Sequence, residues 1–296
     1  MARGLFGKVV SALRWYPGSH TYHYKDVDRV QWNSLGRETI TSEVGRSIVP
    51  VGIYPFDLVP FTSLAAIPEI SSDHPDMEKF LMNIVGSAIQ AGEGKLVTCA
   101  HVAEGLVASK RKGYILGRLI RDGTVRYTPY PIEAAYRYVD PRTDKVNPSV
   151  DLVVLISTAK SIPGLPYEIP IVKWGDSSQL GVGDPVTVGG YPYGVEMFKF
   201  TRSNRGLIQP TFYQGIVGCI LPVMGPGEIR MIQIAVPCAG GMSGGAVFCP
   251  KTGRVLGMVT SCVHAKSIPQ PISYAIPSEI IAPYVNAITF KTRAEE

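Results

Sequence analysis

Short apolar runs rich in β-branched residues, separated by glycine and proline, form the hydrophobic pattern of this chain. Such runs, bounded by turn residues, predict the strands of an all-β protein. The clearest runs lie at 47–53, 84–89, 114–120, 186–189, 229–236 and 255–260. Helical periodicity is rarer, and its best candidates are 5–13, 76–82, a turn after His101, and 278–285.

The composition agrees with a β-rich protein of moderate size. The 296 residues are enough for two barrels with a sizeable core, and 31 glycines and 24 prolines imply many turns. The net charge is +5, but no dense basic block occurs along the chain. Because nucleic-acid binding needs a clustered basic face, we expect no nucleic-acid partner.

The five cysteines are odd in number and follow no zinc-binding spacing. We expect thiols packed as small apolar side chains in a reducing compartment, with a Cys238–Cys262 disulfide as the less favoured alternative. No hydrophobic leader opens the chain, and no run of eighteen apolar residues occurs. These features predict a cytoplasmic protein without a membrane span, and no pattern indicates a metal or another cofactor.

Three segments contain residues that suit nucleophilic catalysis. The first reads GGMSGG at 240–245, where the hydroxyl of Ser243 stands on a tight turn beside bare backbone. The segment LVTCAH ends at His101, and Asp151 precedes the apolar run LVVLI. Each feature alone is more often an ordinary loop, edge or capping residue. The order His, Asp, Ser with these surroundings is that of the chymotrypsin arrangement.

Further segments resemble the trypsin-like serine peptidases, and among them the HtrA/Deg branch, which needs no zymogen activation. The resemblance covers about residues 44–285. It rests on GSA, WGDS, LGVGDPV, VGGYPYG, GLI and SYAIPS, at 86–88, 174–177, 180–186, 188–194, 206–208 and 273–278. It implies a chymotrypsin-like fold of two six-stranded antiparallel β-barrels with a C-terminal helix, and it leaves no room for the PDZ domain of that branch.

The resemblance also divides the chain. It implies an N-terminal extension, a first barrel with His101 and Asp151, a linker, a second barrel with Ser243, and a tail, at 1–42, 43–160, 161–170, 171–290 and 291–296. Aromatic residues gather in the extension, and in HtrA-like proteins such a segment mediates trimer formation. We therefore expect either a homo-oligomer built through residues 1–42 or aromatic rings packed on their own barrels.

The activity implied by the resemblance is that of a serine endopeptidase acting on protein or peptide substrates. Ser243 would attack the peptide carbonyl to form an acyl-enzyme, His101 would transfer the proton, and Asp151 would orient the imidazole. The N–H groups of Gly241 and Ser243 would form the oxyanion hole. Two alternatives stay open: a catalytically silent protease-fold module that binds peptides, and a viral or phage protease that processes a polyprotein.

Met242 departs from the pattern of the digestive trypsins. Those enzymes place an aspartate before the catalytic serine, and it pairs with a new N-terminal ammonium after cleavage. A methionine cannot form that ion pair. The segment RSIV at 46–49 is therefore interpreted as a false activation site, and the oxyanion loop is expected to assemble without proteolysis.

The same resemblance places a specificity pocket beside the serine, with walls from Pro237, Cys238, Thr260, Ser261 and Cys262. No Asp or Glu occurs from 229 to 278, so a preference for Lys or Arg at P1, the residue before the scissile bond, is not expected. A small or apolar P1 residue is favoured. The second possibility is that His264 reaches the pocket and favours an acidic residue.

Overall fold

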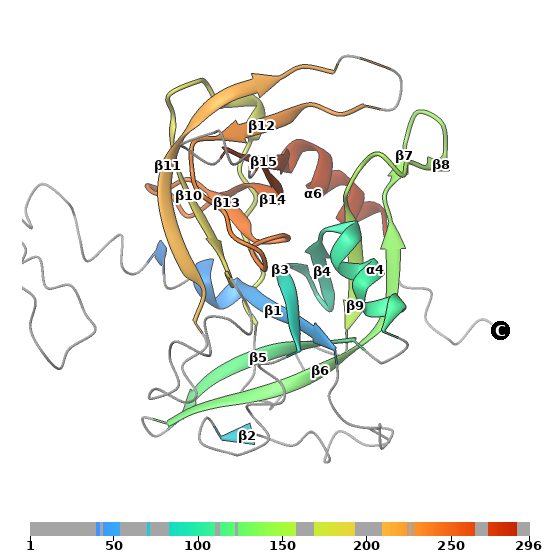
Figure 1. Ribbon diagram of the computed structural model, residues 1–296, viewed down its shortest axis with the longest axis vertical. Helices are drawn as coiled ribbons and strands as arrows, with labels where there is room; N and C mark the ends of the chain where they lie inside the picture. Colours follow the sequence, from blue (N-terminus) through green and yellow to red (C-terminus); the bar gives the residue numbers. More distant parts are fainter. Residues whose placement is uncertain are drawn as a thin grey trace, which may run out of the picture.

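A computed structural model gives the fold of the chain (Figure 1). It describes residues 40–41, 44–53, 70–71, 83–109, 113–121, 124–157, 169–192, 209–223, 225, 228–263 and 272–288. For 70–71, 118–121, 124–126 and 262–263 it describes only the backbone. Several predicted segments lie wholly or mostly outside these residues: the extension at 1–42, the helices at 5–13 and 76–82, the linker at 161–170 and the tail at 291–296.

The first half of the described chain forms a closed antiparallel barrel (Figure 1). Its six strands, in barrel order, are β6 (Thr124–Arg137), β5 (Gly113–Arg121), β1 (Ile48–Ile53), β3 (Ile84–Gly92), β4 (Lys95–Thr98) and β9 (Val153–Ser157). The barrel closes because β6 pairs with β5 through its first half and with β9 through its second half. Two smaller features adjoin β6: the short strand β2 (Ile70–Ser71) and the hairpin of β7 (Val139–Asp140) and β8 (Lys145–Val146).

The second half forms another closed barrel, which a short 3₁₀ helix η2 (Ser177–Gln179) precedes. Its six strands, in barrel order, are β10 (Pro185–Gly190), β11 (Thr211–Leu221), β12 (Met231–Ile234), β15 (Ile272–Pro277), β14 (Val255–Val263) and β13 (Ala246–Phe248). All pairings between these strands are antiparallel. The prediction of an all-β fold with two six-stranded antiparallel barrels is confirmed.

Most strands lie on the predicted apolar runs, but the pattern does not predict β6 or β11. Pro129 and Pro131 interrupt the apolar pattern of β6, and a proline removes a backbone donor from the strand ladder. Both prolines pair with β5, and along 128–131 the second edge of β6 has no partner among the described strands. In β11 only Val217 is buried, so its apolar signal is weak.

His101 lies on a helix rather than at the end of a strand. β4 ends at Thr98, and the helix α4 (Ala100–Ala108) begins after its N-cap residue Cys99. The sequence predicts a single turn here, whereas the structure has a helix of nine residues. Val102 and Leu106, one turn apart, bury its apolar face and dock the helix on the first barrel.

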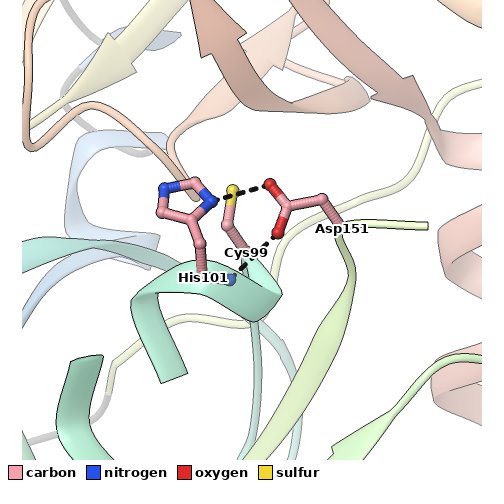
Figure 2. Close-up of side chains that lie close together, drawn as sticks. All are labelled: Cys99, His101 and Asp151. Carbon is pink, nitrogen blue, oxygen red and sulfur yellow. Dashed lines mark hydrogen bonds and ion pairs between the residues drawn. The ribbon is translucent and has the colours of Figure 1, made fainter. Parts of the chain in front are cut away.

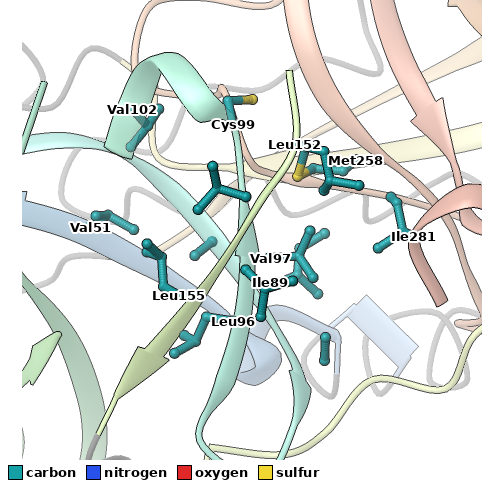
Figure 3. Packing of buried hydrophobic residues seen from close by; sticks show 14 of the residues in the cluster. Val51, Ile89, Leu96, Val97, Cys99, Val102, Leu152, Leu155, Met258 and Ile281 are labelled. Atoms are coloured by element: carbon teal, nitrogen blue, oxygen red, sulfur yellow. The ribbon is translucent and has the colours of Figure 1, made fainter. Parts of the chain in front are cut away.

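The apolar core crosses the boundary between the barrels. One buried cluster joins Val97 of the first barrel to Met258 of β14 and to Ile281 of the C-terminal helix α6 (Ser278–Ala287) (Figure 3). α6 follows the last strand of the second barrel, yet it also contacts β3 and β4 of the first. The helix therefore ties the two barrels together. Among the helices of the described chain, none has the length and apolar character that spanning a membrane requires.

Lys95 closes the C-terminal end of α6, because its ammonium group donates to the carbonyl oxygens of Val285, at 3.1 Å, and Ile288. We expect Lys95→Met to lower the free energy of unfolding by about 1–2 kcal/mol, since helix-terminal carbonyls lose a cationic donor. Urea denaturation measures this loss. Lys251→Met, in an exposed turn, is the matched control and should change stability by less than about 0.5 kcal/mol. Equal stability of the two variants would contradict this role of Lys95.

Candidate active site

The pairing of β4 with β9 brings His101 and Asp151 together. Thr98 pairs with Val153, so the start of α4 lies beside the residues that precede β9. Asp151 is bound by His101 twice: the backbone N–H donates to Oδ1 at 3.0 Å, and the ring Nδ1 lies 2.8 Å from Oδ2 (Figure 2). The carboxylate therefore fixes both the main chain and the ring of His101.

The pKa values of this pair shift in opposite directions. The hydrogen bond to Asp151 raises the pKa of His101, and partial burial offsets only part of the effect. Burial raises the pKa of Asp151, but hydrogen bonds from His101 and Thr260 outweigh it and lower the pKa overall. Asp151 is thus ionised at neutral pH, and an ionised carboxylate only accepts hydrogen bonds. Nδ1 of His101 therefore holds a proton, which leaves Nε2 as the acceptor of the neutral ring.

Ser243 lies in the turn before β13 and is linked to the pair through β14. Its hydroxyl donates to the carbonyl oxygen of Thr260 at 3.4 Å. The hydroxyl of Thr260 donates in turn to Oδ2 of Asp151 at 2.5 Å. Within the described residues no hydrogen bond joins the Ser243 hydroxyl to the ring of His101. The structure thus gathers the three predicted residues around Thr260, with the serine bonded to β14 rather than to the imidazole.

Ser87 of β3 fastens the serine turn to the first barrel, and its side chain is fully buried. Its N–H donates to the carbonyl oxygen of Ser243 at 2.9 Å. Its hydroxyl donates to the carbonyl oxygen of Gly241 at 2.7 Å and accepts from the N–H of Tyr191 at 2.9 Å. Its carbonyl oxygen accepts from the Thr98 hydroxyl at 2.7 Å. The N–H and the hydroxyl of this one residue therefore hold the turn against β3, and its carbonyl oxygen is satisfied within the first barrel.

Two glycines let the backbones approach this closely. Gly244 has a φ of +86°, and a Cβ there would lie 2.0 Å from the carbonyl oxygen of Ser87. A Cβ at Gly86 would lie 2.8 Å from a methyl group of Val102 on α4 and 3.3 Å from the carbonyl oxygen of Ser243. Any larger residue at either position would push the serine turn away from the first barrel.

The residue before the serine is anchored by burial rather than by charge. Met242 is fully buried in the apolar cluster of the second barrel. Ile48, the third residue of the segment RSIV, is buried at the start of β1, and its carbonyl oxygen accepts from the Tyr191 hydroxyl at 3.1 Å. An N-terminus created at Ile48 would therefore begin at the first residue of a paired strand. Apolar packing and the hydrogen bonds of Ser87 hold the turn.

The N–H groups of Gly241 and Ser243 meet no acceptor among the described residues. The neighbouring N–H of Gly244 is paired, because it donates to the carbonyl oxygen of Val259 at 2.8 Å. Two backbone donors next to the Ser243 hydroxyl are thus available to an oxygen atom from outside the chain.

Cys99 places a thiol beside the His–Asp pair. Its Sγ lies within 4.8 Å of ligand atoms of His101 and Asp151, and all three residue types bind zinc. The thiol is fully buried and donates to the carbonyl oxygen of Val259 at 3.2 Å; burial, then the charge of Asp151, raises its pKa well above the usual value. A metal would need the thiolate, and Nδ1 of His101 is already engaged. The cluster therefore fits a hydrogen-bonded support better than a metal centre.

The residues predicted to line the specificity pocket lie in different surroundings. Pro237 is exposed, whereas Cys238 is buried in the core of the second barrel and carries a thiol rather than a disulfide. The hydroxyl of Thr260 is directed to the His–Asp pair, and Ser261 next to it is exposed. The side chain of one predicted residue and the whole of another lie outside the described residues: Cys262 and His264.

An apolar cavity of about 610 Å³ opens beside the His–Asp pair. Asp151 and Thr260 form part of its wall, and Ser261 lies at its β14 side. The remaining lining residues come from the chain before Asp151, the β11–β12 hairpin and β15: Ser149, Val150, Leu221, Pro222, Glu228, Ile229, Met231 and Ile276. Thr260 and Ser261 of the predicted specificity pocket line this cavity, whereas Pro237 and Cys238 do not, so the cavity shares only the β14 side with the predicted pocket.

Three contributing residues were not assigned these roles from the sequence. Ser87 is a polar residue inside the apolar run IVGSAI, and Thr260 is the first polar residue after the run VLGMV. A polar residue that interrupts an apolar strand needs a hydrogen-bond partner, which is a usable signal. Cys99 gives no such signal, because a cysteine beside an apolar strand is typical of a small core residue.

The chain is similar to proteins of a known family. A sequence model of the trypsin-like peptidase domain matches residues 86–258. No curated protein sequence matches the chain.

Solved structures show the same fold. The chain is similar to the HtrA-type protease AlgW with a decapeptide, with 20% identity, a TM-score of 0.52, and coverage of 84% of this chain and 66% of that one. It is also similar to Deg5, with 17% identity, a TM-score of 0.54, and coverage of 87% and 94%. The chain spans 60% to 66% of the length of the AlgW chains solved with a tripeptide and with the decapeptide. At these identities the likeness concerns the fold.

The Ser87 hydroxyl should be essential for the stability of the junction. We expect Ser87→Ala to lower the free energy of unfolding by about 1–3 kcal/mol, because the buried N–H of Tyr191 and carbonyl of Gly241 lose their partner. Chemical denaturation followed by circular dichroism measures the change. Ser149→Ala, at an exposed position, is the matched control and should change stability by less than about 0.5 kcal/mol. A Ser87→Ala variant as stable as this control would show that the junction contributes nothing.

Proposed function

The chain belongs to the family of trypsin-like peptidases, and we propose that it is a serine endopeptidase that cleaves peptide bonds through an acyl-enzyme. The observation that supports this most directly is the His101–Asp151 hydrogen bond of 2.8 Å beside the Ser243 turn. That bond sets the ring to accept a proton at Nε2. The similarity to AlgW structures that contain bound peptides favours a peptide substrate for this chain as well.

In the proposed reaction, Ser243, His101 and Asp151 act as a triad. The Ser243 Oγ forms a bond to the substrate carbonyl carbon, while its proton moves to Nε2 of His101. The tetrahedral intermediate then loses the amine, which takes the proton from His101 as the C–N bond breaks. A water molecule then attacks the acyl carbon while its proton moves to Nε2 of His101. The bond to Ser243 breaks, the Ser243 oxygen takes that proton, and the acid is released. Asp151 remains ionised and stabilises the imidazolium.

Before attack, the Ser243 hydroxyl must leave the carbonyl of Thr260 and turn to the imidazole. Catalytic hydrogen bonds often become short only when substrate is bound. The N–H groups of Gly241 and Ser243 would then bind the oxyanion, and their lack of acceptors among the described residues supports this role. Ser87 would keep the Gly241 peptide in place through its 2.7 Å bond to that carbonyl.

We also propose that the serine turn is competent without proteolytic activation. The buried side chain of Met242 and the hydrogen bonds of Ser87 already hold it. For the P1 residue we propose a small or apolar side chain, because the chain from 229 to 278 contains no carboxylate to pair with a basic one. His264 at the pocket would instead favour an acidic P1 residue, and cleavage of a peptide library would decide between them.

A catalytically silent peptide-binding module is the alternative that one observation favours. The Ser243 hydroxyl is bonded to Thr260 rather than to His101. A protein whose Ser243 hydroxyl never bonds to the ring of His101 would bind peptides without cleaving them. Covalent labelling of the serine separates the two functions, because only an activated hydroxyl reacts with a fluorophosphonate.

We expect a fluorophosphonate probe to label the full-length chain once, at Ser243, and Ser243→Ala to abolish labelling. The same variant should lower kcat on a fluorogenic peptide by about 10⁶-fold, as loss of a triad nucleophile does. Intact-mass spectrometry of the labelled protein tests the absence of activation, since an N-terminus at Ile48 would contradict it. Ser178→Ala, at an exposed serine, should be labelled like the wild type. Unlabelled but folded wild-type protein would favour the silent module.

The activity should depend on deprotonation of His101. Because the Asp151 hydrogen bond raises the pKa of His101, kcat/KM should fall as the pH drops through an apparent pKa above the usual value of about 6.5. Asp151→Asn removes the negative charge that stabilises the imidazolium, so the inflection should move to lower pH and kcat should fall by about 10⁴-fold. Initial rates measured from about pH 5 to about pH 9 give both the inflection and kcat. An unchanged inflection in Asp151→Asn would exclude His101 as the titrating base.

A further inference from the structure

Cys99 occupies the N-cap position of α4, but its side chain does not cap the helix. Its backbone is extended, and its thiol makes no bond to the first turn of α4. This position usually holds Ser, Thr, Asp or Asn, whose side-chain oxygen accepts from an N–H group of that turn. The thiol instead donates to β14, at 3.2 Å from the carbonyl oxygen of Val259 and 3.9 Å from that of Thr260. Burial raises the pKa of the thiol, so it keeps the proton that it donates.

The carbonyl oxygen of Val259 is shared between this thiol and the serine turn. It also accepts from the N–H of Gly244 at 2.8 Å, and the N–H of Val259 donates to the carbonyl oxygen of Gly245 at 2.8 Å. A carbonyl oxygen has two lone pairs. Here one is used by the first barrel, through Cys99, and the other by the serine turn. The thiol therefore ties this part of β14 to the start of α4.

Thr260 is the extra residue of a β-bulge in β14. Val259 lies opposite Ala275 of β15 and Ser261 lies opposite Tyr274, which leaves no residue of β15 opposite Thr260. On the other edge of β14, the pairing with β13 has already ended. Bulges redirect side chains and are common beside active sites. Strand pairing thus leaves the orientation of Thr260 to contacts outside the ladder, and the Cys99 thiol is one of them.

The hydroxyl of Thr260 meets Asp151 at the oxygen that faces the ring of His101. It donates to Oδ2 at 2.5 Å, and Nδ1 of His101 lies 2.8 Å from the same atom. The bond from Thr260 stabilises the carboxylate and lowers the pKa of Asp151. An Asp151 without this donor would be a stronger acceptor for the imidazolium. A small displacement of the bulge would therefore change the state of the His–Asp pair.

We infer that Cys99 is a positioning residue, whose thiol holds the bulge of β14 so that Thr260 keeps its hydrogen bond to Asp151. It acts through Thr260 and takes no part in the chemical step. What the inference says of catalysis rests on the proposed endopeptidase function. Its effect on the His101–Asp151 pair does not require cleavage and can be measured separately.

Titration of the His101 ring in the full-length Ser243→Ala protein tests the effect on the pair. NMR of isotope-labelled histidine follows the ring, and the signal that is lost in a His101→Gln variant identifies it. Cys99→Ala should raise the pKa of His101 by about 0.3 or more, because Asp151 loses the Thr260 donor and holds the imidazolium more strongly. Thr260→Val removes the hydroxyl itself and should raise the pKa at least as much.

The effects of the two substitutions should not add. When both are combined, the pKa of His101 should equal that of Thr260→Val to within about 0.1, because the thiol acts through that hydroxyl. Glu104, whose charge also raises the pKa of His101, is the same in every variant. The inference is overturned if Cys99→Ala leaves the pKa of His101 unchanged, or if its effect persists without the Thr260 hydroxyl.

Activity provides a second measurement. Cys99→Ala should lower kcat on a fluorogenic peptide by about tenfold, and Cys99→Ser, which keeps a donor, should stay within about threefold of the wild type. Cys249→Ala, at a half-buried cysteine that follows β13, is the matched control and should change neither kcat nor the titration. Equal losses in Cys99→Ser and Cys99→Ala would contradict the role of the donated bond.

Melting temperatures establish that each variant is folded. If Cys99→Ala unfolds, Cys99→Val takes its place, because it fills the site without supplying a donor. A wild type that resists fluorophosphonate labelling, while Cys99→Ala still shifts the His101 titration, would contradict the endopeptidase function and leave Cys99 as the residue that adjusts the His–Asp pair. A labelled wild type whose His101 titration does not respond to Cys99→Ala would contradict the inference alone.

Discussion

The site depends on one buried junction, at which Ser87 of the first barrel holds the serine turn of the second. Each barrel satisfies its own backbone by strand pairing, and a shared apolar core and α6 hold the two barrels together. The junction fixes the serine turn on β3, because the N–H of Ser87 donates to the carbonyl oxygen of Ser243 and its hydroxyl donates to that of Gly241. Displacing the turn would leave several buried polar groups without partners, and each such group costs about 1–3 kcal/mol. Gly86 and Gly244 make the close approach sterically possible.

The His101–Asp151 pair and Ser243 are positioned by different parts of the fold. The His101–Asp151 pair is a property of the first barrel alone, since the pairing of β4 and β9 places both residues. Ser243 reaches that pair only through contact between the barrels. Thr260 makes the connection, as it accepts from the serine hydroxyl and donates to Asp151. Cys99 of the first barrel adds a bond to the second barrel, because its thiol donates to the carbonyl oxygen of Val259 in β14.

Much of this could be predicted from the sequence. The apolar runs between glycines and prolines indicated an all-β fold, and most strands lie on them. The local settings of His101, Asp151 and Ser243 singled out the residues that the fold gathers around Thr260. The misses have physical causes: Pro129 and Pro131 interrupt the apolar pattern of β6, and β11 has too few buried residues for a clear pattern. Thr260 was assigned to a pocket wall, because a strand position does not reveal the direction of a hydroxyl.

The sequence by itself determined which side chains are available and the short-range geometry in which each is presented. A glycine-flanked serine forms a tight turn, and an apolar run forms a strand, because such preferences arise from residues close together in the chain. The tertiary structure alone decided the partner of each polar group: the Ser243 hydroxyl on Thr260, the Ser87 hydroxyl on Gly241, and the cavity between Asp151 and the β11–β12 hairpin. These contacts join residues far apart in sequence, and their geometry follows from how two closed barrels pack, which no local pattern encodes.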